Sequence, residues 1–144
     1  FKKSIEQQII RLNLSDNIIL HPPVPFSEIG KYYEKSKTGI LTWLPTLKNL
    51  HAVPIKIFEY MAFGLPVIFT NRGAAVSYIV ENNCGLLTDP YSPIEIAEAM
   101  LKLLLDDKLY SEKSKNGMDA VKSELNWKKE SENLISFYKG LTLP

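Results

Sequence analysis

The chain has 144 residues, of which 45% are hydrophobic and 23% are charged, and its formal net charge at pH 7 is +1. This is the composition of an ordinary globular domain, and a charge so close to zero gives no electrostatic reason to expect a nucleic-acid partner. No apolar run approaches the ~20 residues of a membrane span. The single cysteine, Cys84, excludes a disulfide framework and fits a reducing compartment, so we expect a cytoplasmic location.

Helical and strand-like segments alternate along most of the chain. In order, they are a helix over 3–14, a strand over 17–21, a helix over 27–36, a strand over 39–43, a helix over 54–63, a strand over 65–70, a short helix over 75–81, a strand over 85–89 and a helix over 93–105. Strands that alternate with helices at this spacing predict an α/β fold with a doubly wound, Rossmann-like parallel sheet.

The helix over 93–105 has a clear beginning. Ser92 is its expected cap, Pro93 suits the first position, and Glu95 closes a capping box. Its expected apolar stripe consists of Ile94, Ala97, Leu101, Leu104 and Leu105.

Beyond residue 107 the alternation stops, and the sequence predicts two C-terminal helices broken near Leu125 and Asn126. In the second helix, Trp127, Leu134, Tyr138 and Leu141 recur at helical spacing, which predicts that they pack into a core.

Residues 54–68 form the most informative segment. Pro54 suits the first position of a helix, Gly64 suits its end, and Pro66 prevents continuation into the buried strand that follows. Two charged residues, Lys56 and Glu59, interrupt this otherwise apolar helix. They allow two interpretations: an i, i+3 ion pair on a partly exposed face, or an anion site in which Lys56 meets a phosphate and Glu59 a ribose diol.

The stretch KIFEYMAFGLPVI, residues 56–68, resembles the donor-binding signature of retaining glycosyltransferases of GT-B architecture, in family 4, the glycosyl transferases group 1 type. The resemblance continues through 83–90 and extends more weakly over 17–24 and 32–45. It implies that 1–144 is one domain, the carboxyl-terminal donor-binding lobe. Upstream strands and the amino-terminal acceptor lobe are then absent, and this fragment alone is expected to be inactive.

The resemblance also implies roles for individual residues. Glu59 matches the second acid of the family's Glu-x7-Glu pattern and would hold the nucleotide ribose, while the amides of Ile55 and Lys56 would cradle the diphosphate. His51 stands where the first acid, which meets the sugar, is usual. A turn with Pro23 and Val24 matches the place where the backbone meets the nucleobase.

By the same resemblance, the substrate is a nucleotide-diphosphate sugar, and a hexose-type sugar passes to a glycan or lipid-linked acceptor through the absent lobe. No catalytic residue is assigned, and no metal or other cofactor is expected, because amides and basic side chains neutralise the diphosphate. Membrane contact is not expected through this segment. Two alternatives stay open: a non-catalytic nucleotide-binding module, which His51 favours, and another GT-B enzyme such as a nucleotide-sugar epimerase.

The family's lobe has parallel strands in the order 3-2-1-4-5-6, numbered along the chain, and this sequence supplies strands three to six. The strand over 17–21 would therefore lack a neighbour beside 39–43. We expect upstream residues or a second chain to fill that gap, rather than direct pairing of 17–21 with 39–43, because unpaired backbone groups in a buried sheet are costly.

Overall fold

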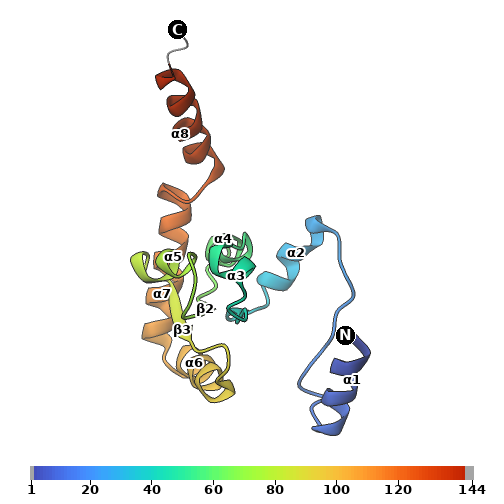
Figure 1. Ribbon diagram of the computed structural model, residues 1–144. Coiled ribbons are helices and arrows are strands. Elements are labelled where there is room, and N and C mark those ends of the chain that lie inside the picture. The colour runs from blue at the N-terminus through green and yellow to red at the C-terminus, as the bar shows by residue number, and fades with distance from the viewer. Residues whose placement is uncertain (1, 142–144) are drawn as a thin grey trace. The chain divides into compact units, whose positions relative to one another are not determined.

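A computed structural model describes residues 2–141 (Figure 1). The chain divides into two compact units, Phe1–Gly30 and Lys31–Pro144, and each is described by itself.

The first unit contains helix α1, Lys2–Arg11, whose buried residue is Ile9. The chain leaves this helix through Asn13, which has a left-handed φ of 54°. The amide of Asn13 donates to the Ile10 carbonyl and that of Leu14 to the Ile9 carbonyl, both at 3.0 Å, which is the Schellman pattern of a helix end. The predicted continuation to residue 14 is therefore a turn.

The predicted strand over 17–21 is wrong, because this segment has no regular secondary structure. A strand needs a neighbour to satisfy its amides and carbonyls, and its sequence alone does not supply one. Our expectation that other residues fill the gap beside 39–43 stays a prediction. Helix α2, Phe26–Tyr33, follows across the boundary of the two units and ends three residues before the predicted limit.

The second unit contains a parallel sheet of β1, Gly39–Leu41, β2, Val67–Thr70, and β3, Gly85–Thr88, in the order β1-β2-β3. Ile40 pairs with Ile68, and Ile68 pairs with Leu86. This order matches that of the last three strands of the predicted lobe.

Helices cover both faces of this sheet, which confirms the doubly wound fold class. Val67 and Phe69 of β2 pack with buried residues of α4, Lys56–Ala62, α5, Val76–Glu81, and α7, Asp107–Ser123. Ile68 points to the opposite face and packs on Ala99 and Leu103 of α6, Pro93–Leu105. All four residues of β2 are buried, so this strand is the centre of the core.

The connection from α4 to β2 confirms the predicted role of Gly64, which has a φ of +68°. Its amide donates to the Met61 carbonyl at 3.0 Å and the Leu65 amide to the Tyr60 carbonyl at 2.9 Å, again a Schellman pattern. The predicted start of the helix is wrong by two residues. Pro54 lies before α4, and its carbonyl accepts a hydrogen bond from the Ile57 amide in a preceding turn.

Helix α6 has the predicted limits and half of the predicted capping box. The Ser92 hydroxyl accepts from the Glu95 amide at 3.2 Å, but the Glu95 carboxylate accepts from the Asp89 amide at 2.9 Å instead of from Ser92. The predicted apolar stripe is wrong, because Ala99 and Leu103 form the packed face and Ile94 is 72% exposed. The other stripe residues are also exposed: Ala97, Leu101, Leu104 and Leu105. Apolar residues lie on both sides of this helix, so periodicity does not identify its packed side.

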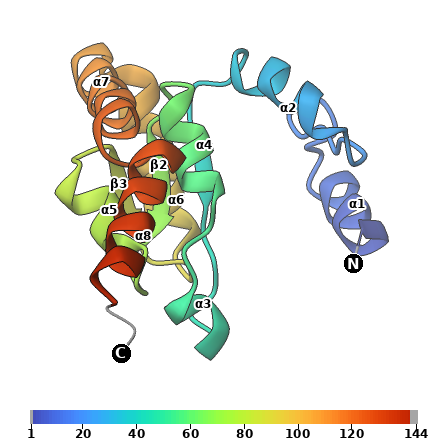
Figure 2. The ribbon, with the colours of Figure 1, turned by 90° about the horizontal axis from the view of Figure 1, so that it is seen from above.

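The two predicted C-terminal helices are present as α7 and α8, Trp127–Gly140, with the break at 124–126 (Figure 2). The predicted core packing of α8 is wrong, because the helix has no buried residue and Trp127 is 76% exposed. Leu134, Tyr138 and Leu141 are exposed as well. Among the described residues, no helix has both the length and the apolar character needed to cross a membrane.

Candidate functional site

The structure brings together Lys56 and Glu59 of α4 with Tyr33, the last residue of α2. The two α4 residues are three positions apart, so they lie on the same side of the helix. Pro66 links the beginnings of β1 and β2. Its carbonyl, just before β2, accepts hydrogen bonds from the Thr38 hydroxyl and from the Gly39 amide at the start of β1.

Three hydrogen bonds connect these side chains. The Lys56 ammonium donates to Glu59 Oε2 at 2.8 Å and to the Tyr33 hydroxyl oxygen at 3.1 Å. The Tyr33 hydroxyl donates to the same Glu59 Oε2 at 2.7 Å. Glu59 Oε1 accepts no hydrogen bond from any other residue within 2–141. The i, i+3 ion pair is therefore present, and its carboxylate keeps one oxygen open for a ligand.

The local electrostatics keep both members of the ion pair charged. The hydrogen bond to Glu59 raises the pKa of Lys56. Burial acts to raise the pKa of Glu59, but hydrogen bonds from Lys56 and Tyr33 outweigh burial and lower it. Burial, assisted by the bond to Glu59, raises the pKa of Tyr33, which remains a neutral donor. The side chain of Glu59 is 17% exposed and that of Lys56 is 39% exposed, so a solute can reach both.

Ile55 directly precedes α4, and its backbone is helical. No described residue accepts a hydrogen bond from the amide of Ile55 or of Lys56. The Ile55 side chain, which is 68% exposed, borders an apolar groove of about 440 Å³. The other principal lining residues are Val53, Phe58, Tyr78, Leu125 and Trp127.

His51 is the last residue of α3, Leu47–His51, a short helix that the sequence analysis did not predict between the strand over 39–43 and the helix over 54–63. The Thr46 hydroxyl caps α3 by accepting from the Asn49 amide at 3.3 Å, a signal that the sequence analysis missed. His51 is exposed, and its side chain forms no hydrogen bond or ion pair with another described residue. The structure does not test its assignment to the sugar.

Pro23 and Val24 belong to the first unit, whereas His51, Ile55, Lys56 and Glu59 belong to the second. The structure therefore groups only Lys56 and Glu59 directly, and the nucleobase contact at Pro23 and Val24 stays a prediction.

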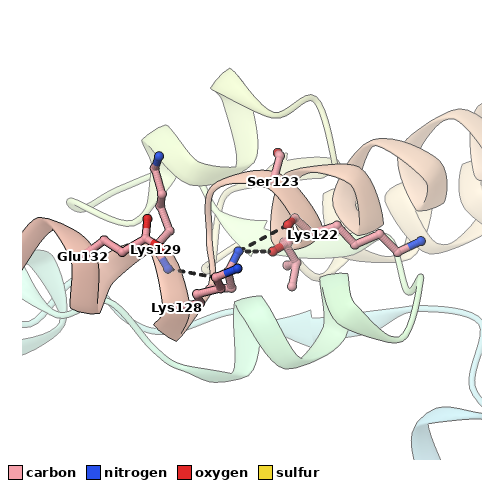
Figure 3. A pocket seen from close by; sticks show the side chains of 7 residues that line it. Lys122, Ser123, Lys128, Lys129 and Glu132 are labelled. Carbon is pink, nitrogen blue, oxygen red and sulfur yellow. Dashed lines mark hydrogen bonds between the residues drawn. The ribbon is translucent and has the colours of Figure 1, made fainter.

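A separate hollow of about 420 Å³ lies where α7 gives way to α8, and three lysines line it (Figure 3). Lys122 and Lys129 point in different directions in Figure 3, so their ammonium groups do not converge on one anion. Within residues 2–141, no group of three or more His, Cys, Asp or Glu side chains is arranged to hold a metal ion. The Lys56–Glu59 pair is therefore the better candidate site.

Tyr33 is the site residue that the sequence analysis missed. Its hydroxyl bonds to a residue 26 positions away, and helical periodicity carries no information about such a contact. The available signal was an aromatic residue near the end of the predicted helix over 27–36, with a phenol able to reach a neighbouring helix.

Comparisons with known proteins identify the family of the chain. The family described as Glycosyl transferases group 1 matches residues 1–119. Over 82 residues, the chain is 33% identical to sucrose-phosphate synthase 4 of Arabidopsis thaliana, an alignment that covers 57% of this chain and 8% of that protein. A 64-residue alignment with sucrose-phosphate synthase of Zea mays is 39% identical and covers 44% of this chain and 6% of the relative.

Two solved structures share the fold. The C-terminal domain of the glycosyl transferase group 1 family protein LpcC from Francisella tularensis has a TM-score of 0.74 and 27% identity, over 88% of this chain and 63% of that one. Sucrose-phosphate synthase from Thermosynechococcus elongatus has a TM-score of 0.82 and 23% identity, over 96% of this chain and 34% of that one. The chain thus spans a small part of the curated relatives and about a third of the latter structure.

Proposed function

Because this chain belongs to the glycosyl transferases group 1 family, we propose that it forms the donor-binding lobe of a retaining glycosyltransferase. The likeness to the C-terminal domain of a group 1 protein, at 27% identity, supports the assignment to that lobe. The donor is a nucleotide-diphosphate sugar, and the acceptor is a glycan or lipid-linked glycan. The proposed location of the reaction is the cytoplasm, because its reducing conditions suit a chain whose single cysteine is free and buried.

The observation that carries this proposal is the pairing of Lys56 and Glu59 on one partly exposed side of α4. An ammonium group and a carboxylate one helical turn apart match a diphosphate joined to a ribose. The Lys56 ammonium neutralises the diphosphate and stabilises the negative charge that grows on it as the sugar leaves. Glu59 Oε1, which is open, accepts hydrogen bonds from the ribose hydroxyls.

No described nucleophile is paired with an orienting base near these residues, and the proposed role of this lobe is to bind and orient the donor. The unpaired amides of Ile55 and Lys56 add donors for the diphosphate without a metal ion. His51 is assigned to a hydroxyl of the sugar.

The experiment measures binding of uridine, guanosine and adenosine diphosphates to the intact protein by calorimetry. One of them should bind, and Glu59→Ala should weaken that binding by about 1.5–3 kcal/mol through the loss of hydrogen bonds to a charged acceptor. Glu81→Ala is the matched control, because Glu81 is an exposed acid at the end of α5.

Equal nucleotide affinities of wild type and Glu59→Ala would show that Glu59 does not bind the nucleotide.

The exposed His51 stands where the family pattern has an acid, and it favours a second candidate function, a binding module without transferase activity. Nucleotide binding by the intact protein without any sugar transfer or donor hydrolysis would support that candidate.

A further inference from the structure

The Tyr33 hydroxyl lies between the two charged side chains of the candidate site. It donates to Glu59 Oε2 at 2.7 Å and accepts from the Lys56 ammonium at 3.1 Å. The ammonium also lies 5.8 Å from the centre of the Tyr33 ring. Tyr33 therefore contacts both members of the pair from outside α4.

The Tyr33 ring is held by two aromatic residues, one in α4 and one directly after it. Its centre lies 5.3 Å from that of Tyr60, at an interplanar angle of 82°, and 5.2 Å from that of Phe63, at 68°. Edge-to-face contacts of this kind fix the direction of a ring. The hydroxyl is thus aimed at Glu59 by packing that does not involve the carboxylate.

This arrangement leaves the two oxygens of Glu59 in different states. Oε2 accepts from both Lys56 and Tyr33, whereas Oε1 accepts from no described residue. We propose that Tyr33 is a positioning residue that fixes the orientation of the Glu59 carboxylate, so that Oε1 is presented to the ribose hydroxyls of the nucleotide. This inference rests on the proposed function.

A second anchor is needed because Lys56 has another task at this site. An ammonium that turns toward a diphosphate weakens its bond to Glu59, and the carboxylate then depends on its other donor. A neutral phenol has no attraction to phosphate comparable to that of a cation, and its bond to Oε2 persists when the diphosphate binds. Tyr33 therefore separates recognition of the ribose from recognition of the phosphates.

The test uses Tyr33→Phe, which keeps the ring and removes only the hydroxyl. Calorimetry gives the Kd of the intact protein for the nucleoside diphosphate that binds and for its 2′-deoxy and 2′,3′-dideoxy forms. Wild type should prefer the ribose form by roughly tenfold or more. Tyr33→Phe should reduce this preference by about three- to tenfold and leave the affinity for the dideoxy form within about twofold.

Three further variants isolate the hydroxyl. Tyr78→Phe is the matched control, since the Tyr78 ring packs edge-to-face on Phe58 at 5.1 Å and no described residue hydrogen-bonds to its hydroxyl. It should leave the preference unchanged. 4-Aminophenylalanine at position 33 restores a donor and should restore the preference. In a Glu59→Gln background, Tyr33→Phe should have no further effect on the preference for the ribose form.

The outcomes separate this inference from the proposed function. Equal weakening of the ribose and dideoxy forms by Tyr33→Phe would show a general structural role and overturn the inference, while the proposed site stands. If wild type bound the nucleotide without a preference for ribose, two assignments would be overturned: that Glu59 binds the ribose, and that Tyr33 positions Glu59 for it. Absence of binding by any nucleoside diphosphate would overturn the proposed function itself. If Tyr33→Phe does not fold, 4-fluorophenylalanine at position 33 keeps the size of tyrosine without a donor and gives the same measurement.

Discussion

Helices α4 and α8 look alike in sequence and differ completely in their surroundings. Each has apolar residues at helical spacing, interrupted by charges. In α4, Ile57 and Met61 are fully buried, whereas α8 has no buried residue and its Leu134 is 49% exposed.

The difference comes from the neighbours of each helix. Met61 of α4 packs with β2, α5 and α7, and Gly117 of α7 lies against it. A Cβ on Gly117 would lie 3.4 Å from the Met61 Cα. Periodicity thus identifies which side of a helix is apolar, but the presence of a partner decides whether that side is buried.

Truncation of one residue in each helix should give the largest contrast. Ile57→Ala is expected to lower the free energy of unfolding by about 2–5 kcal/mol, because it removes buried methyl groups and leaves a cavity. Leu134→Ala should lower it by less than about 0.5 kcal/mol, as is usual for exposed positions. Urea denaturation measures both values. A cost for Leu134→Ala comparable to that for Ile57→Ala would show that α8 is covered in the protein in solution.

Sequence features that act locally gave correct structure. Gly64 and the Ser92 cap fixed a helix end and a helix start, because the signals lie within a few residues of the geometry they determine. Features that depend on distant partners failed. The strand over 17–21 needed a neighbouring strand, and the packed side of α6 depended on which side meets the sheet.

The candidate site shows the same division. The pairing of Lys56 with Glu59 follows from their spacing on one helix, and the sequence contained it as one of two interpretations. The contact of Tyr33 with both depends on how α2 approaches α4, which only the tertiary structure provides.

Glycines at the two helix ends sharpen the comparison. Gly64→Ala should cost about 1–2 kcal/mol, because a residue with a Cβ is strained at a φ of +68°. The new Cβ would also lie 3.0 Å from the Ser114 hydroxyl oxygen. Gly140→Ala, at the end of α8, meets no atom within 4 Å and should be neutral or slightly stabilising. Thermal unfolding of both variants distinguishes them, and a similar loss from each would contradict the conformational argument.

The α8 cap tests whether this helix is maintained locally. Asn126 accepts from the Lys129 amide at 3.0 Å and donates to the Val121 carbonyl at 2.9 Å. Asn126→Ala should cost about 1 kcal/mol, and because α8 has no buried residue, the cost should fall on α8 and on the last turn of α7, whose Val121 carbonyl loses a donor. Amide hydrogen exchange should accelerate over 129–140 and stay unchanged in α4. Ser92→Ala is the matched cap on α6, and its effect should extend to the sheet.

The smallest effect concerns pH and the ion pair of α4. The pKa of Glu59 is lowered in the folded state, so its contribution to stability is present above the unfolded pKa and is lost as the pH falls through the folded pKa. The pKa of Lys56 is raised, so its contribution is present below the unfolded value of 10.5 and is lost as the pH rises through the folded value. The stability difference between wild type and Glu59→Gln should therefore be constant between about pH 5 and 10 and decline on both sides.

This difference should stay below about 1 kcal/mol, because the Lys56 side chain is 39% exposed and water screens the pair. Glu132→Gln on α8 is the control, since no ion pair of Glu132 with another described residue exists and its variant should show no such pH dependence. Urea midpoints of the three proteins at pH 3.5, 7 and 10.5 are the measurement. A wild-type advantage that persists unchanged at pH 3.5 would mean that Glu59 acts through its shape and not through its charge. The ribose assignment would then need a neutral acceptor in place of the carboxylate, and α4 would resemble α8 in gaining nothing from its charges.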